Sequence, residues 1–181
     1  MEFEEKTFAL KNGQQALLRR LQPADAEKML EFLRETSRES DFLLRYPEEN
    51  IMGISEEVKF LEGICQSDNK IMLACVIDGS VAGNISLRGN DYRKLRHRAE
   101  LALAVRKNYW HLGIGRAMLT EAVGIARNLG LKYLELDYID GNARAKGLYE
   151  SLGFQEIARI PQAYCQPDGT FADAILMRKC L

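Results

Sequence analysis

The fold is decided by one stretch, Arg98 to Leu119, which reads RAELALAVRKNYWHLGIGRAML. From Ala99 to Val105, aliphatic side chains alternate with smaller or polar ones, which is the two-residue period of a strand. From Ile114 onward, an apolar residue recurs at every fourth position, as it does on one face of a helix. Gly113 and Gly115 stand at the join, so the stretch predicts a strand, a tight glycine loop and a helix.

This order of elements aims backbone N–H groups at an anion. The first N–H groups of a helix have no partner within it, and the helix dipole favours negative charge there. Glycine lets the backbone approach an anion, because no Cβ intervenes. We therefore predict a phosphorylated ligand at the turn from Trp110 to Arg116. The loop is not a Rossmann fingerprint, which needs a third glycine where Met118 stands, and it lacks the Gly-Lys-Ser/Thr ending of a P-loop.

A second informative segment, Asn142 to Phe154, reads NARAKGLYESLGF. It follows a predicted strand, Tyr133 to Tyr138, and Asn142 suits the N-cap of a helix. Together with the glycine loop, it resembles the GCN5-related N-acetyltransferase (GNAT) family. Members carry a Gln/Arg-x-x-Gly-x-Gly/Ala loop at the pyrophosphate of acetyl-CoA and a later Asn-x-x-Ala…Leu-Tyr-x-x-x-Gly-Phe segment. The chain departs from the first motif where Trp110 stands for Gln or Arg; because the loop binds through its backbone, we expect binding to survive.

The order of predicted elements agrees with the fold that this resemblance implies. Periodicity predicts strands over residues 16–21, 71–77, 81–87, 99–105, 133–138, 155–165 and 171–178, and helices opening at Pro23, Ser55, Ile114 and Asn142. Residues 1–6 are expected to be frayed, and residues 36–54 to form a polar, irregular connection. The expected fold class is α/β (α+β mixed), a GNAT-like fold whose central mixed, mostly antiparallel β-sheet carries helices on both faces. Residues 1–181 would form a single acetyltransferase domain.

The resemblance implies an enzyme that moves the acetyl group of acetyl-CoA to a primary amine by direct transfer in a ternary complex. A small-molecule amine or an amino acid is the favoured acceptor. One alternative is a protein N-terminal or lysine acetyltransferase, and another is a CoA-binding sensor module without catalysis. Acetyl-CoA would be a co-substrate. No metal is expected, because the two histidines, His97 and His111, and the four cysteines show no metal-binding spacing.

Acetyl transfer to an amine needs few protein groups. The resemblance implies that Tyr149 donates a proton to the sulfur of CoA. A lysine-like amine is only about one part in a thousand neutral near pH 7.4, so a general base helps. Glu100 and Asp137 are the candidates, since a carboxylate in an apolar strand is costly unless it is partnered or functional, and Asp137 matches a carboxylate of ribosomal-protein-type members. Each would otherwise face solvent or pair with a basic residue.

The resemblance also implies which residues hold acetyl-CoA. The pantetheine arm would lie along the backbone of three strand residues, Leu103, Ala104 and Val105. The pyrophosphate would lie at the glycine loop, formed by Trp110, His111, Leu112, Gly113, Ile114, Gly115 and Arg116. Three residues of the downstream segment would complete the site, Asn142, Lys146 and Tyr149.

The acceptor side is less constrained. The connection around residues 35–51 combines carboxylates with apolar side chains, which would suit a cationic amine: Glu35, Glu39, Asp41, Glu48 and Glu49 among Phe42, Leu43, Leu44, Tyr46 and Ile51. It would alternatively be an ordinary solvated loop, and the basic loop from Gly89 to Arg98 would instead favour an acidic acceptor. 

Composition narrows the partners and the compartment. The net charge of −1 argues against nucleic acid and against an anionic membrane surface as partners. No apolar run is long enough to span a membrane, and no N-terminal signal is apparent. We expect a cytoplasmic protein, and a homodimer that pairs residues 171–177 is an open alternative to a monomer.

Overall fold

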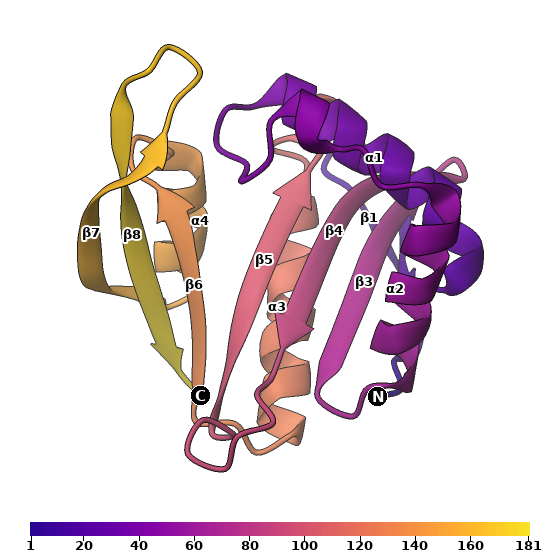
Figure 1. Cartoon of the computed structure of the whole chain (residues 1–181). Helices are drawn as coiled ribbons and strands as arrows, with labels where there is room; N and C mark the ends of the chain where they lie inside the picture. The colour runs from indigo at the N-terminus through magenta and orange to yellow at the C-terminus, as the bar shows by residue number, and fades with distance from the viewer.

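Helices cover both faces of an eight-stranded sheet in the computed structural model, which describes residues 1–181 (Figure 1). The strands are β1 (Lys6–Ala9), β2 (Gln15–Arg20), β3 (Lys70–Ile77), β4 (Ser80–Arg88), β5 (Arg98–Val105), β6 (Tyr133–Ile139), β7 (Gln155–Cys165) and β8 (Phe171–Cys180). The helices are α1 (Ala26–Glu39), α2 (Ile54–Gln66), α3 (Ile114–Asn128) and α4 (Ala143–Ser151), with 3₁₀ turns η1 (Pro23–Asp25), η2 (Pro47–Glu49) and η3 (Lys107–Tyr109). The strand order is β1-β2-β3-β4-β5-β6-β8-β7, and every neighbouring pair is antiparallel except β5 and β6. The predicted mixed, mostly antiparallel sheet is thus confirmed.

Two hydrophobic cores lie on opposite faces of this sheet. The larger core packs α3 against the sheet through apolar residues such as Ile114 and Met118. The smaller core packs α1 and α2 against β3 and β4, with Phe32 and Leu61 fully buried in it. Because α1 and α2 lie mainly over β3 and β4, most of the same face of β5 and β6 is left uncovered (Figure 1).

β5 and β6 form the parallel pair of the sheet, and they separate soon after they meet. Arg98 to Glu100 pair with Tyr133 to Glu135, and the ladder stops there. β5 continues along β4 up to Val105, whereas β6 continues along β8 up to Ile139. The two strands therefore diverge towards their carboxyl ends, as Figure 1 shows. Beyond Glu100, the edge of β5 that faces β6 has no strand partner.

The N-terminal third differs from the prediction. Residues 6–9 form β1, which pairs with β2, so Lys6, the last residue of the stretch expected to be frayed, lies in a strand. α1 runs on to Glu39, although the chain was expected to be irregular from Thr36. The hydroxyls of Thr36 and Ser37 donate to carbonyls one turn back, at 2.7 and 2.9 Å. These bonds satisfy two polar side chains inside the helix, which composition alone marks as a loop.

α2 begins at Ile54, one residue before the predicted opening at Ser55. Gly53 is the N-cap residue, and its N–H donates to Glu56 Oε2 at 2.9 Å. A carboxylate three residues into a helix stabilises the start in this way, so the helix can open without a Ser or Thr side chain at the cap.

Candidate active site

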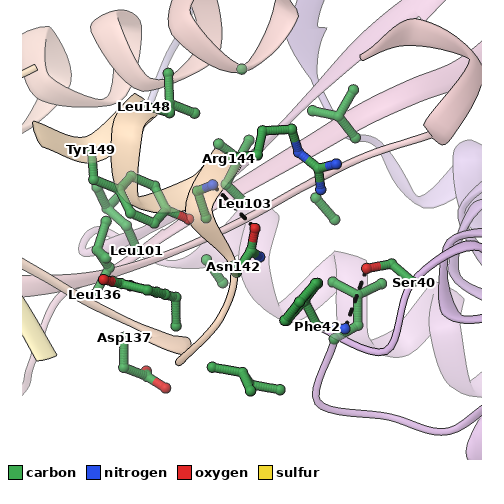
Figure 2. Close-up of a pocket in the computed structure, with 18 of the residues that line it drawn as sticks. Ser40, Phe42, Leu101, Leu103, Leu136, Asp137, Asn142, Arg144, Leu148 and Tyr149 are labelled. Atoms are coloured by element: carbon green, nitrogen blue, oxygen red, sulfur yellow. Dashed lines mark hydrogen bonds between the residues drawn. The ribbon is translucent and has the colours of Figure 1, made fainter. Parts of the chain in front are cut away.

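A cavity of about 730 Å³ fills the space between the diverging strands (Figure 2). Its walls come mainly from β5, the glycine loop and the start of α3, β6, α4, and the end of α1 with the segment that follows it, and β7 contributes Tyr164. α3 follows β5 and α4 follows β6, so both helices begin near the carboxyl ends of the diverging strands. The cavity therefore joins two helix N-termini to the uncovered face of β5 and β6.

The glycine loop offers a row of free donors. None of the backbone N–H groups from His111 to Arg116 donates to an acceptor within the protein. The loop turns through left-handed backbone at His111 (φ 64°) and Gly113 (φ 101°), a conformation that glycine adopts without strain. Gly115 lets α3 approach α4, because a Cβ there would lie 3.1 Å from Leu148 Cδ2. Free donors at the positive end of a helix are what a phosphate group requires.

Trp110 anchors this loop to the end of β5. Its indole Nε1 donates to the carbonyl of Val105 at 2.7 Å. Gln or Arg at this position would also bring a side-chain N–H, so the departure from the family motif keeps a donor in place. The ring also carries Arg144 of α4, whose Cζ lies 3.2 Å from the ring centroid. Sequence reasoning missed Arg144, because nothing local links it to Trp110.

Tyr149 reaches the cavity from α4 (Figure 2). It is only 7% exposed, and its ring packs against Tyr138 and Phe154 with centroid distances of 6.0 and 6.1 Å. Burial raises the pKa of Tyr149 to about 12, so the hydroxyl is neutral at physiological pH and available to donate. At the start of the same helix, Asn142 accepts the N–H of Ala145 at 3.1 Å. Its side-chain NH₂ group remains free towards the cavity.

The two candidate bases lie on the uncovered face. Leu101 belongs to the larger core, so its neighbour Glu100 points to the opposite face, and alternation along β6 places Asp137 there too. Both are exposed and both line the cavity. Asp137 accepts a hydrogen bond from the hydroxyl of Tyr164 on β7. Burial, followed by this bond, raises the pKa of Tyr164 to about 12. Glu100, in contrast, has no partner in the protein.

Some predicted site residues do not join the others. Lys146 lies outside the cavity and pairs with Glu150 at 3.9 Å, as an exposed helical lysine often does. Leu112 does not line the cavity, because its side chain packs against the larger core. Tyr164 lines the cavity but was not predicted, since it belongs to no motif.

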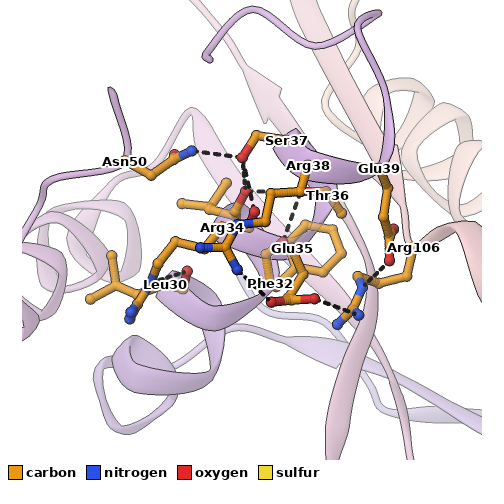
Figure 3. A network of polar contacts seen from close by, with 11 residues as sticks. Leu30, Phe32, Arg34, Glu35, Thr36, Ser37, Arg38, Glu39, Asn50 and Arg106 are labelled. Carbon is orange, nitrogen blue, oxygen red and sulfur yellow. Dashed lines mark hydrogen bonds and ion pairs between the residues drawn. The ribbon is translucent and has the colours of Figure 1, made fainter. Parts of the chain in front are cut away.

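Of the carboxylates expected on the acceptor side, only Glu39 lines the cavity, and most of that wall is apolar. Phe42, Leu43 and Leu44 line the cavity after α1, whereas Asp41, Glu48 and Glu49 do not. The two remaining carboxylates of that set are engaged by Arg106, which follows β5 (Figure 3). Arg106 Nε donates to Glu39 at 3.1 Å, and its Nη2 donates to Glu35 at 3.3 Å. 

The second carboxylate oxygen of Glu39 accepts the N–H of Lys107 at 2.7 Å. Glu39 therefore ties the end of α1 to the turn that leads into the glycine loop.

Neither a metal site nor a membrane-spanning helix is seen in the structure. No group of three or more His, Cys, Asp or Glu side chains is placed to hold a metal ion. None of the helices combines the length and the apolarity that crossing a membrane requires.

Comparison with known proteins agrees with this geometry. Two curated relatives from Escherichia coli K12 match parts of the chain. The L-amino acid N-acetyltransferase AaaT is 28% identical over 111 residues, which are 61% of this chain and 67% of that protein. The [ribosomal protein bS18]-alanine N-acetyltransferase is 39% identical over 75 residues, which are 41% of this chain and only 50% of that protein.

Solved structures match over nearly the whole chain. The acetyltransferase of GNAT family from Streptococcus pneumoniae has a TM-score of 0.88 at 30% identity, and covers 92% of this chain and 99% of its own. The Salmonella typhimurium protein yncA, solved with its cofactor acetyl-CoA, has the same fold, with a TM-score of 0.79 at 21% identity over 91% of this chain and 92% of its own. The model of the acetyltransferase (GNAT) family matches residues 27–154. The chain belongs to this family, and it is an acetyl-CoA-dependent N-acetyltransferase.

Proposed function

We propose that the chain transfers the acetyl group of acetyl-CoA directly to the primary amine of a small molecule or amino acid, with both substrates bound at once. One observation carries this proposal: a single cavity contains both the free N–H donors of the glycine loop and the unpaired carboxylate of Glu100 on the uncovered face of the sheet. Because acetyl-CoA and the amine would occupy different parts of this cavity at the same time, the amine can attack the thioester directly, and no covalent enzyme intermediate is needed.

The residues present fit acetyl-CoA. The N–H groups from His111 to Arg116 would take the pyrophosphate, and the free edge of β5 at Leu103 to Val105 would hold the pantetheine arm. The free NH₂ group of Asn142 would donate to an amide of that arm. When bound, acetyl-CoA supplies an activated thioester; the protein contributes orientation and two proton transfers.

Glu100 is the better candidate for the base. Its carboxylate has no partner, whereas that of Asp137 already accepts from Tyr164. Glu100 would take a proton from the acceptor ammonium, directly or through a water, so that the neutral amine can attack. The neutral hydroxyl of Tyr149 would donate its proton to the leaving sulfur.

A bridge across the acceptor side supports a small acceptor. Tyr46 Oη donates to the carbonyl of Cys165 at 2.6 Å, which joins the segment after α1 to the β7–β8 hairpin. The neighbouring residues on both sides of this contact, Phe42 to Leu44 and Tyr164, line the same cavity as Glu100, so we propose that the contact restricts the size of the acceptor. A protein N-terminus is the second candidate acceptor, and the match to a ribosomal-protein-alanine N-acetyltransferase favours it.

A panel of amines, scored by release of the CoA thiol, tests the acceptor class. It should contain L-amino acids, polyamines and short peptides that begin with alanine. We expect turnover with free amino acids or other small amines. A kcat/KM that is higher for the peptides would replace the small-molecule proposal by a protein acceptor.

A matched pair of variants tests the base. Glu100→Gln should lower kcat by about 10²-fold and remove the acid limb of its pH profile. Asp137→Asn keeps an oxygen for Tyr164 and should change kcat much less. The opposite ranking would assign the base to Asp137.

A further inference from the structure

Arg144 lies flat on the ring of Trp110. Its Cζ is 3.2 Å from the ring centroid, which is the separation of two stacked planar groups. A tilted guanidinium at this distance would push a nitrogen into the ring, so the two planes must be close to parallel. All five N–H donors of a guanidinium lie in its plane. Stacking therefore leaves every donor of Arg144 pointing outward, away from the indole.

No group in the protein uses these donors. Arg144 makes neither a hydrogen bond nor an ion pair, whereas Arg106 is held by two carboxylates. Burial lowers the pKa of Arg144, but an arginine still carries its charge at neutral pH. A partly buried cation without an anionic neighbour is stabilised by an anionic ligand.

The Trp110 ring, on which Arg144 stacks, is held next to the glycine loop. Trp110 is held to Val105 by the bond from its Nε1, and it directly precedes His111, where the row of free N–H groups begins. Arg144 and the loop residues from His111 to Arg116, except Leu112, line the same cavity. The stack thus sets a rigid, forked cation beside the predicted phosphate position.

We infer that Arg144, held on Trp110, binds the pyrophosphate of CoA together with the N–H groups of the glycine loop. The inference rests on the proposed position of that pyrophosphate. It moves the cationic role from Lys146, which is paired with Glu150 outside the cavity, to a residue of the same helix that sequence reasoning missed. The phosphates, and not only the pantetheine arm, then govern the affinity for CoA.

Calorimetric titration with three probes tests this role: CoA, dephospho-CoA, which lacks only the 3′-phosphate, and pantetheine, which lacks all phosphates. Arg144→Gln should weaken CoA and dephospho-CoA alike by about tenfold, the value of a charge-assisted hydrogen bond, and leave pantetheine unchanged. Lys146→Gln is the matched control on the same helix and should bind all three as the wild type does. Unchanged affinity for CoA in Arg144→Gln would overturn the inference. So would a loss confined to CoA, which would place Arg144 at the 3′-phosphate, or an equal loss for pantetheine.

A double-mutant cycle tests whether the Trp110 ring is what holds Arg144 in place. Trp110→Leu removes the ring, and in that background Arg144→Gln should cost much less CoA affinity than in the wild type, because the guanidinium is no longer held. Simple additivity would show that Arg144 acts without Trp110 and would overturn that part of the inference. Thermal unfolding of each variant verifies that it is folded. CoA binding needs no acceptor, so a failed amine panel leaves this test intact, and a failed test here leaves the acceptor question open.

Discussion

Removing the hydroxyl of Tyr149 separates its chemistry from its packing. Tyr149→Phe keeps the ring between Tyr138 and Phe154, at centroid distances of 6.0 and 6.1 Å. The hydroxyl has no partner in the protein, so its loss leaves no buried group unsatisfied, and stability should stay within about 0.5 kcal/mol of the wild type. A proton donor to the leaving sulfur is worth about 10²-fold in rate, or about 2.7 kcal/mol of barrier. We therefore expect a large fall in kcat, with a much smaller rise in KM for acetyl-CoA.

Initial rates of thiol release over a range of acetyl-CoA concentrations measure both constants, and thermal unfolding measures stability. Tyr138→Phe is the matched control, because Tyr138 is a buried tyrosine of the same aromatic cluster, and its kcat should be close to that of the wild type. Burial holds the pKa of Tyr149 near 12, so the wild-type rate should not fall through loss of this proton below about pH 11. A Tyr149→Phe variant with wild-type kcat would remove Tyr149 from the mechanism.

Three further predictions concern the frame around the site. Glu39→Gln should lower the free energy of unfolding by about 1–2 kcal/mol and raise KM for both substrates, because Glu39 joins Arg106 and the turn that leads into the glycine loop to α1. An unchanged KM in steady-state kinetics would show that this link does not couple the cofactor side of the site to the acceptor side. Gly113→Ala should cost about 1–2 kcal/mol in thermal unfolding, since φ is 101° there, whereas Gly115→Ala should cost less, because the contact at 3.1 Å is with the flexible end of a leucine; equal losses would contradict the backbone argument. Burial raises the pKa of Cys75 from 9.0 to about 12, so the unfolded thiol ionises first and stability should fall by about 1.4 kcal/mol per pH unit above pH 9; Cys75→Ala should flatten this decline in unfolding measured from pH 8 to 11, and an equally steep decline would exclude Cys75 as its cause.

The parts of the site that the sequence predicts are local ones. The strand, glycine loop and helix around Gly113 are contiguous, and their period and glycines are visible in one short window. The left-handed backbone at Gly113 and the cap at Asn142 are likewise set by one residue and its near neighbours. For these positions the physical cause lies within a few residues, so a single sequence suffices.

The missed parts depend on contacts between distant segments. Tyr164 and Asp137 are 27 residues apart, and Glu39 and Arg106 are 67 apart. Such pairs leave no period or motif in one chain, because each partner alone is an ordinary polar residue on a strand or helix. Arg144 illustrates the limit: its position in the downstream segment was visible, but only the fold brings it onto Trp110.

The parting of β5 from β6 explains why the cofactor and acceptor sides share one cavity. Glu100 is the last residue of β5 to pair with β6, so it lies at the point where the strands separate. Val105 lies at the far end of β5, about 16 Å further along a strand that rises 3.3 Å per residue. The N-termini of α3 and α4 gather at that far end, because each helix follows the strand that ends there. In the proposed complex, phosphates at the wide end and an amine at the narrow end would therefore be separated by the length of an extended arm along the free edge of β5. If Glu100 is the base, as proposed, this spacing would bring the thioester to it, and a longer or shorter parallel ladder would move its carboxylate away from the reacting carbon.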